Sequence, residues 1–269
     1  MNEKNYDYLK DQLKYSGFGE THTDELKDKL QKQSPEFTIF HQQDFGKDNT
    51  VSMLYFKKSA ESDMYFFNRY ELLMKNGEHT DPLKQTFYMK NKEDNITLKE
   101  SYNMMNGRAV HKELTNKEGQ KYTAWVQLDF KVTDKNGNYE TKKFHQNYGY
   151  DLAQSLARYP IKELSNETDR TKLIESLERG NRQSVTWQHE GKEQKILIEA
   201  SPQFKSMNMY DSNIKRVNVQ SLYEKHGEIQ SAKQETKKEV LKQDKSGEDD
   251  VEGPRQSLKR ARKKSLKIS

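Results

Sequence analysis

Cysteine is absent from the 269 residues, which excludes disulfide bonds and thiolate metal sites and suits a reducing compartment. Long apolar runs are absent as well, since no stretch approaches the roughly 20 residues that a membrane-spanning helix needs. The opening segment MNEKNYDYLKDQ is charged and lacks the apolar region of a secretory signal. These absences predict a cytoplasmic protein that does not contact a membrane.

Apolar residues are few, at 31 % of the chain, while charged residues make up 33 %. This apolar share is below that of ordinary globular domains and would supply one large core poorly. The 15 Tyr, 11 Phe and 2 Trp partly compensate, because each aromatic side chain buries a large area. We therefore expect thin layers with aromatic cores, together with a disordered portion.

Positive charge is concentrated at the carboxyl end. Residues 255–269 contain seven Lys or Arg and no acidic residue. Because the whole chain carries +5 at pH 7 and this segment +7, residues 1–254 carry −2. A concentrated charge attracts an anionic partner better than a dispersed one, so this segment is the strongest functional signal in the sequence.

Helix signals open the first 92 residues and strand signals follow. Leu9 and Leu13 recur at helical spacing, and a second helix has Thr23 or Asp24 as its expected cap. Runs rich in β-branched and aromatic residues then predict four strands, within 36–42, 50–59, 62–74 and 85–90.

The same order of helix and then strands occurs twice more. Asn95 or Thr97 can cap a helix that ends at Gly107, and a later helix ends at Gly180. Between them, apolar residues alternate along 122–130, the clearest period of two in the chain. Strands are expected within 109–114, 121–133, 139–149, 183–189, 193–200 and 203–211.

The spacing of these helices suggests an internal repeat. Leu26, Leu98 and Leu173 start equivalent helical stretches 72 and 75 residues apart, and the last two copies match best. Two copies, three copies and a chance match all remain open on this evidence.

The predicted fold is α+β, with short helices packed on antiparallel β-meanders in two or three tandem modules and a disordered tail. The expected parts are an N-terminal α+β module at 1–92, a central helix plus β-meander module at 93–164, a third helix plus β-hairpin module at 165–217, and a charged tail at 218–269. The tail is rich in Gln, Lys and Glu and cannot bury enough apolar area to order itself.

Several stretches carry a resemblance to a known family. They are MNGRAVHKELTNKEGQKYTAWVQLDF, SDMYFFNRY, FHQNYGYDL, SLERGNRQSV and EASPQFKSMNMYD. Together, over roughly residues 1–216, they resemble a family of unknown function encoded on conjugative transposons and other mobile elements of Bacteroidetes. Members sometimes stand beside or are fused to topoisomerase-like sequences. The resemblance implies an accessory protein acting near DNA processing or transfer, and it implies no catalytic residue.

Signatures of catalysis and metal binding are missing. The seven His residues show no helical metal-ligand spacing, and no HExxH, GxSxG or P-loop pattern occurs. We therefore expect neither an enzyme nor a cofactor.

Basic residues are the candidates for a nucleic-acid site. Arg108 and Lys112 surround one helix end and hairpin, and Arg182 stands at the equivalent point of the next copy. The candidates in the basic end are Lys259, Arg260, Arg262, Lys263, Lys264 and Lys267. Such cations bind phosphates without reading the base sequence. The alternative interpretations are a solvated turn for the first group and a soluble tail with no particular partner for the basic end.

Two functional hypotheses follow, and an enzyme of unrecognised type stays open as a third. The first is a non-enzymatic accessory protein of a mobile or conjugative element that binds nucleic acid, with DNA as its partner, through its basic end. The second is a protein–protein interaction module that docks another protein of the element through sheet edges or exposed aromatic residues.

Overall fold

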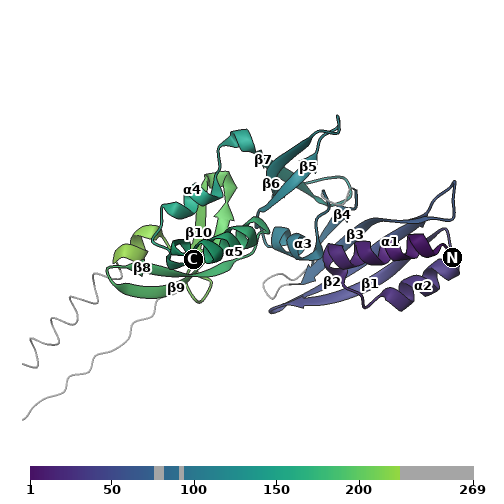
Figure 1. Cartoon of the computed structure of the whole chain (residues 1–269), viewed down its shortest axis with the longest axis horizontal. Coiled ribbons are helices and arrows are strands. Elements are labelled where there is room, and N and C mark those ends of the chain that lie inside the picture. Colours follow the sequence, from purple (N-terminus) through teal and green to yellow (C-terminus); the bar gives the residue numbers. More distant parts are fainter. Residues whose placement is uncertain (76–81, 91–93, 225–269) are drawn as a thin grey trace, which may run out of the picture. The chain divides into compact units, whose positions relative to one another are not determined.

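The computed structural model describes residues 1–75, 82–90 and 94–224. The chain divides into two units, Met1–Tyr223 and Glu224–Ser269. Nearly all described residues belong to the first unit, which is an α+β structure with three antiparallel sheets, as predicted (Figure 1). The predicted disordered tail lies almost entirely outside the described residues.

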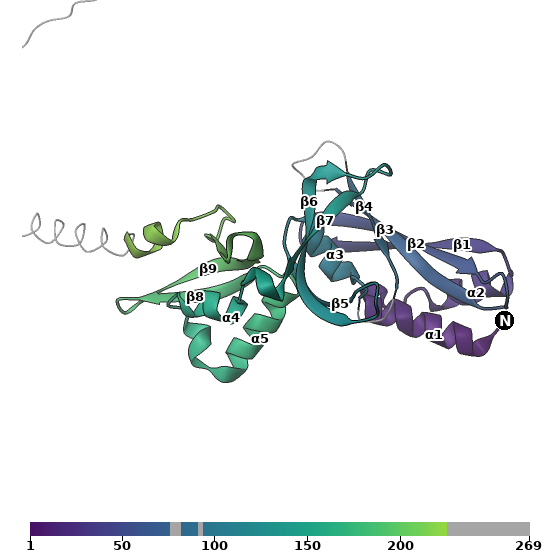
Figure 2. The same cartoon turned by 90° about the horizontal axis from the view of Figure 1, so that it is seen from above.

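The first sheet is a four-stranded meander in the order β1-β2-β3-β4. Its strands are β1 (Glu36–Phe45), β2 (Asp48–Lys58), β3 (Tyr65–Lys75) and β4 (Leu83–Tyr88). The helices α1 (Glu3–Leu13) and α2 (Thr23–Gln31) lie on one face of this sheet (Figure 2). Asn5 of α1 fixes the packing, because its side chain both donates to and accepts from the backbone of Tyr65.

The cap of α2 differs from the prediction. His22, and neither Thr23 nor Asp24, occupies the N-cap position, and it makes no side-chain cap bond. Thr23 cannot serve as the cap because it is already the first helical residue, and its hydroxyl donates to the carbonyl oxygen of Glu20.

The other two sheets have three strands each. The second sheet has the order β5-β6-β7, and its strands are β5 (Val110–Thr115), β6 (Lys121–Thr133) and β7 (Tyr139–His145). The third has the order β10-β9-β8, and its strands are β8 (Gln183–His189), β9 (Lys192–Ser201) and β10 (Ser206–Tyr210). The helices α3 (Leu98–Met105), α4 (Leu152–Ala157) and α5 (Glu167–Glu178) accompany them.

The caps of α3 follow the prediction. Thr97 and Glu100 form a capping box, in which each side chain bonds to the other's backbone N–H. The helix ends before Gly107, whose φ of +75° is a conformation that favours glycine.

Two hydrophobic cores hold the first unit together. One core joins α1, α2 and the first sheet to α3 and to Val126 and Leu128 of β6. The other joins α4, α5 and the third sheet to Trp125 of β6. Both faces of β6 are therefore buried around residue 125, so the second sheet contributes to both cores. The division of the chain at 92, 164 and 217 stays a prediction.

In residues 1–75, 82–90 and 94–224, no helix has both the length and the apolar character to cross a membrane.

Candidate functional site

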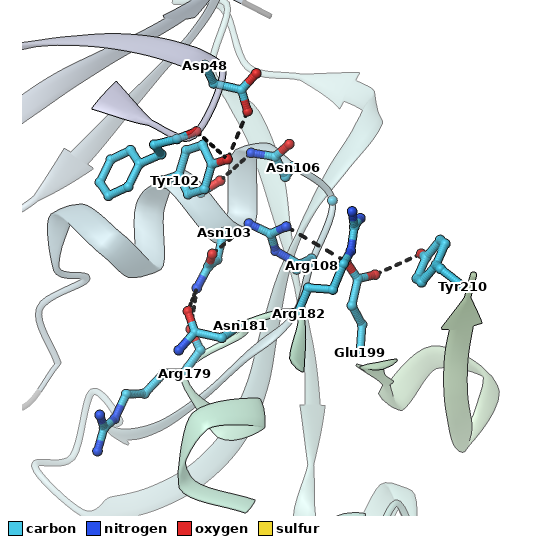
Figure 3. A network of polar contacts seen from close by, with 12 residues as sticks. Asp48, Tyr102, Asn103, Asn106, Arg108, Arg179, Asn181, Arg182, Glu199 and Tyr210 are labelled. Carbon is cyan, nitrogen blue, oxygen red and sulfur yellow. Dashed lines mark hydrogen bonds and ion pairs between the residues drawn. The ribbon is translucent and has the colours of Figure 1, made fainter. Parts of the chain in front are cut away.

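A network of polar side chains connects α3 to the third sheet, and Glu199 of β9 is at its centre (Figure 3). Its carboxylate accepts a hydrogen bond from Arg182 Nε at 2.7 Å and another from the hydroxyl of Tyr210 at 2.8 Å. Arg108 Nη1 lies 3.8 Å from the same carboxylate. One buried carboxylate therefore serves two guanidinium groups.

Local structure explains the position of Arg108. After α3 ends, the chain turns at Gly107 and the backbone N–H of Arg108 donates to the carbonyl oxygen of Asn103. The guanidinium then folds back and donates to the side-chain oxygen of Asn103 at 2.6 Å. Only 8 % of Arg108 is exposed, and burial lowers the pKa of its guanidinium.

Asn103 also links α3 to the end of α5. Its side-chain amide donates to the carbonyl oxygen of Arg179 at 2.7 Å and to the side-chain oxygen of Asn181 at 2.9 Å. Between those two residues, Gly180 has a φ of +77°, and a Cβ there would lie 2.9 Å from the carbonyl oxygen of Ala109. This close approach requires glycine, and it brings the loop that carries Arg182 next to Arg108.

A cleft of about 560 Å³ opens beside this network. Its lining comes from the β1–β2 turn, α3, the start of β5 and the loop from α5 to β8: Asp44, Phe45, Gly46, Lys99, Tyr102, Asn103, Arg108, Asn181, Arg182 and Gln183.

Two stacked aromatic rings form part of the cleft wall. The rings of Phe45 and Tyr102 are 4.3 Å apart between centroids, and Tyr102 donates its hydroxyl proton to Asp48 at 2.8 Å. Lys99 Nζ lies 4.6 Å and 4.7 Å from the centroids of these two rings, within cation–π range. Burial, and secondarily the charge of Arg108, lowers the pKa of Lys99.

The structure brings together some of the predicted nucleic-acid residues. Arg108 and Arg182, predicted as equivalent positions of two copies, both reach Glu199. Lys112 lies apart from them, with its ammonium 3.2 Å from the Glu100 carboxylate. All three cations contact acidic side chains of this protein. The six predicted residues of the basic end lie outside the described residues, so all nine assignments stay predictions.

Sequence reasoning missed Lys99, Asn103, Glu199 and Tyr210. A signal existed for Glu199, because it follows the apolar run Ile196–Ile198 in a strand that had to be buried on one face. No local pattern marks Lys99 or Asn103, since their importance comes from what the fold places beside them.

Within residues 1–75, 82–90 and 94–224, no group of three or more His, Asp or Glu side chains is arranged to hold a metal ion. The only His pair with a close ring contact among those residues is His22 with His41, whose ring nitrogens are 2.9 Å apart.

Comparisons with known proteins add no family. No protein-family model, no curated protein and no solved structure matches this chain. The resemblance to proteins of mobile elements therefore stays a prediction.

Proposed function

We propose that this chain is a non-enzymatic accessory protein of a mobile or conjugative element, and that it binds nucleic acid nonspecifically through its basic carboxyl end. The observation that carries the proposal is the charge of residues 255–269, where seven Lys or Arg occur with no acidic residue. Cations that neutralise phosphates release condensed counterions, and this release drives binding without sequence readout.

The rest of the chain supports a division of roles. Residues 1–254 carry a net charge of −2, and Arg108, Lys112 and Arg182 each contact an acidic side chain of the protein. We therefore expect the electrostatic attraction to nucleic acid to come from the basic end. The resemblance to proteins of conjugative transposons supports DNA of the element as the partner.

The test is fluorescence anisotropy with short single- and double-stranded DNA over a series of salt concentrations. The unmodified protein should bind with log K falling about 5 units per decade of salt on duplex DNA, if about six phosphates are neutralised. A full-length variant with Lys259, Arg260, Arg262, Lys263, Lys264 and Lys267 changed to Gln should lose this binding.

A matched control removes the same charge elsewhere. It carries Gln at six exposed lysines that form no ion pair in the described structure, namely Lys4, Lys27, Lys32, Lys135, Lys172 and Lys215. This variant should keep most of the affinity. Equal losses in both variants, or undiminished binding by the first, would refute the proposal.

A second candidate function is a protein–protein interaction module. It is favoured by the face of the first sheet that α1 and α2 leave uncovered, where Phe40 is 61 % and Tyr88 59 % exposed. A protein partner held there predicts capture that tolerates high salt and survives loss of the basic end. Changing Phe40 and Tyr88 to Ser should abolish that capture.

A further inference from the structure

The cleft beside Glu199 contains more positive than negative charge. Lys99, Arg108 and Arg182 line it, and Asp44 is the acidic side chain in its lining. Glu199 adds one negative charge behind the two guanidinium groups. The cleft lining therefore holds three cations against one carboxylate, and two more carboxylates, Glu199 and Asp48, contact lining side chains.

The two guanidinium groups are incompletely satisfied. Arg182 reaches Glu199 through Nε and stacks on the ring of Tyr210 at 4.6 Å. Within residues 1–75, 82–90 and 94–224, the hydrogen bond of its guanidinium to Glu199 uses Nε, and neither terminal amino group bonds to an acceptor. Arg108 is more than nine-tenths buried, and its Nε has no hydrogen-bond partner within the described part of the chain.

Lys99 is the most available cation of the three. It contacts the rings of Phe45 and Tyr102, and no described carboxylate pairs with it. Lys99 is the second residue of α3, and it lines the cleft together with Arg182. An anion between these two side chains would gain charge-assisted hydrogen bonds from both.

We propose that this cleft binds a phosphate group, with Lys99 and the terminal amino groups of Arg182 as its donors. The planar fork of a guanidinium matches two phosphate oxygens, and an ammonium can contact a third. The cleft volume of about 560 Å³ is many times that of a phosphate ion, so the group belongs to a larger molecule. That the larger molecule is a nucleic acid rests on the proposed function. The phosphate site itself does not depend on it.

The experiment uses the full-length protein and inorganic phosphate as the first probe. Phosphate is titrated at constant ionic strength while amide signals are followed by ¹H–¹⁵N NMR. Signals from residues 44–46, 99–103 and 181–183 should move together, with one dissociation constant. Lys99→Gln should weaken binding about tenfold, the effect of one lost hydrogen bond to a charged group.

Two further variants keep the test sharp. Lys172→Gln makes the same chemical change at an exposed residue of α5 and should leave phosphate binding unchanged. Arg182→Lys retains the positive charge but removes the planar guanidinium that can contact two phosphate oxygens. This variant should bind phosphate more weakly, and thermal unfolding checks that its fold is intact. The proposal is overturned if the cleft signals do not move, or if Lys99→Gln binds phosphate as tightly as the unmodified protein.

A second probe, a short single-stranded oligonucleotide, distinguishes the source of the phosphate. If Lys99→Gln lowers oligonucleotide affinity while the basic end is intact, the backbone of nucleic acid occupies the cleft. If phosphate fills the cleft but no oligonucleotide binds, the site stands with a small phosphorylated molecule as its ligand, and the proposed function fails. If the oligonucleotide binds through the basic end and phosphate leaves the cleft signals unmoved, the site fails and the proposed function stands.

Discussion

Replacing Glu199 by Gln should destabilise the protein severely. The substitution keeps the size of the side chain and removes the charge that serves both Arg108 and Arg182. Arg108 then becomes an uncompensated charge in a position where only 8 % of the residue is exposed. Removing one partner of a buried pair is costly because the other partner cannot regain its hydration.

The magnitude follows from the geometry. At the 3.8 Å that separates Arg108 Nη1 from Glu199, the Coulomb energy is about 4 kcal/mol with an effective dielectric constant of about 20. The pair with Arg182 is shorter but adds less, because about a quarter of the Arg182 side chain is exposed and solvent screens it. We expect a loss of about 3–5 kcal/mol in the free energy of unfolding.

The assay is urea unfolding at pH 7 followed by tryptophan fluorescence. Both tryptophans, Trp125 and Trp187, belong to the core that contains β9, so the signal reports on the affected region directly. As a control, Glu140→Gln changes an exposed glutamate of β7 that itself forms no ion pair in the described structure, and it should cost less than about 0.5 kcal/mol.

A double-mutant cycle tests the physical reasoning. When Arg108→Gln is combined with Glu199→Gln, the loss should be smaller than the sum of the single losses by about 1–3 kcal/mol. If Glu199→Gln costs no more than the Glu140 control, or if the two substitutions are simply additive, the carboxylate does not stabilise the protein by neutralising Arg108.

Two other predictions concern packing and pH. Gly180→Ala should destabilise the protein more than Gly119→Ala does. Both glycines have φ near +80°, but only at Gly180 would a Cβ meet the carbonyl oxygen of Ala109, at 2.9 Å. Thermal unfolding of the two variants measures the difference in stability. Burial lowers the pKa of His41 below its ordinary 6.5, so the unfolded chain binds the proton more readily. Stability should therefore be full above about pH 6.5 and should fall as the pH drops below it. His41→Gln should show a shallower decline in Tm between about pH 7.5 and 5.5. Equal costs at the two glycines, or an unchanged pH slope in His41→Gln, would contradict these arguments.

Local signals predicted most elements of the fold. The alternation along 122–130 predicted β6, and Thr97, one of the two residues expected to cap α3, is its N-cap. The predicted cap of α2 was wrong because the helix begins at Thr23, which leaves the preceding residue, His22, in the N-cap position. Which of two neighbouring residues adopts the cap conformation depends on the preceding turn, and composition does not reveal it.

The candidate site was predictable only in part. Arg108 and Arg182 stood out as basic residues after two similar helices, and the structure places both beside Glu199. The sequence contained no signal that one carboxylate would serve both, or that Lys99 would face the same cleft. Lys112 was predicted together with Arg108 at the same helix end and hairpin, but its ammonium lies beside the carboxylate of Glu100.

By itself, the sequence determined the α+β class, the order of helices and strands and the concentration of charge at the carboxyl end, since these depend on neighbouring residues and on composition. Tertiary structure alone decided which charges neutralise one another and where a cationic cleft remains. Asn103 bonds to the backbone of Arg179, 76 residues away, and Gly180 permits the contact between the two loops. Pairing over such distances depends on how the cores pack, because the energy of a charge is set by the neighbours that burial brings to it.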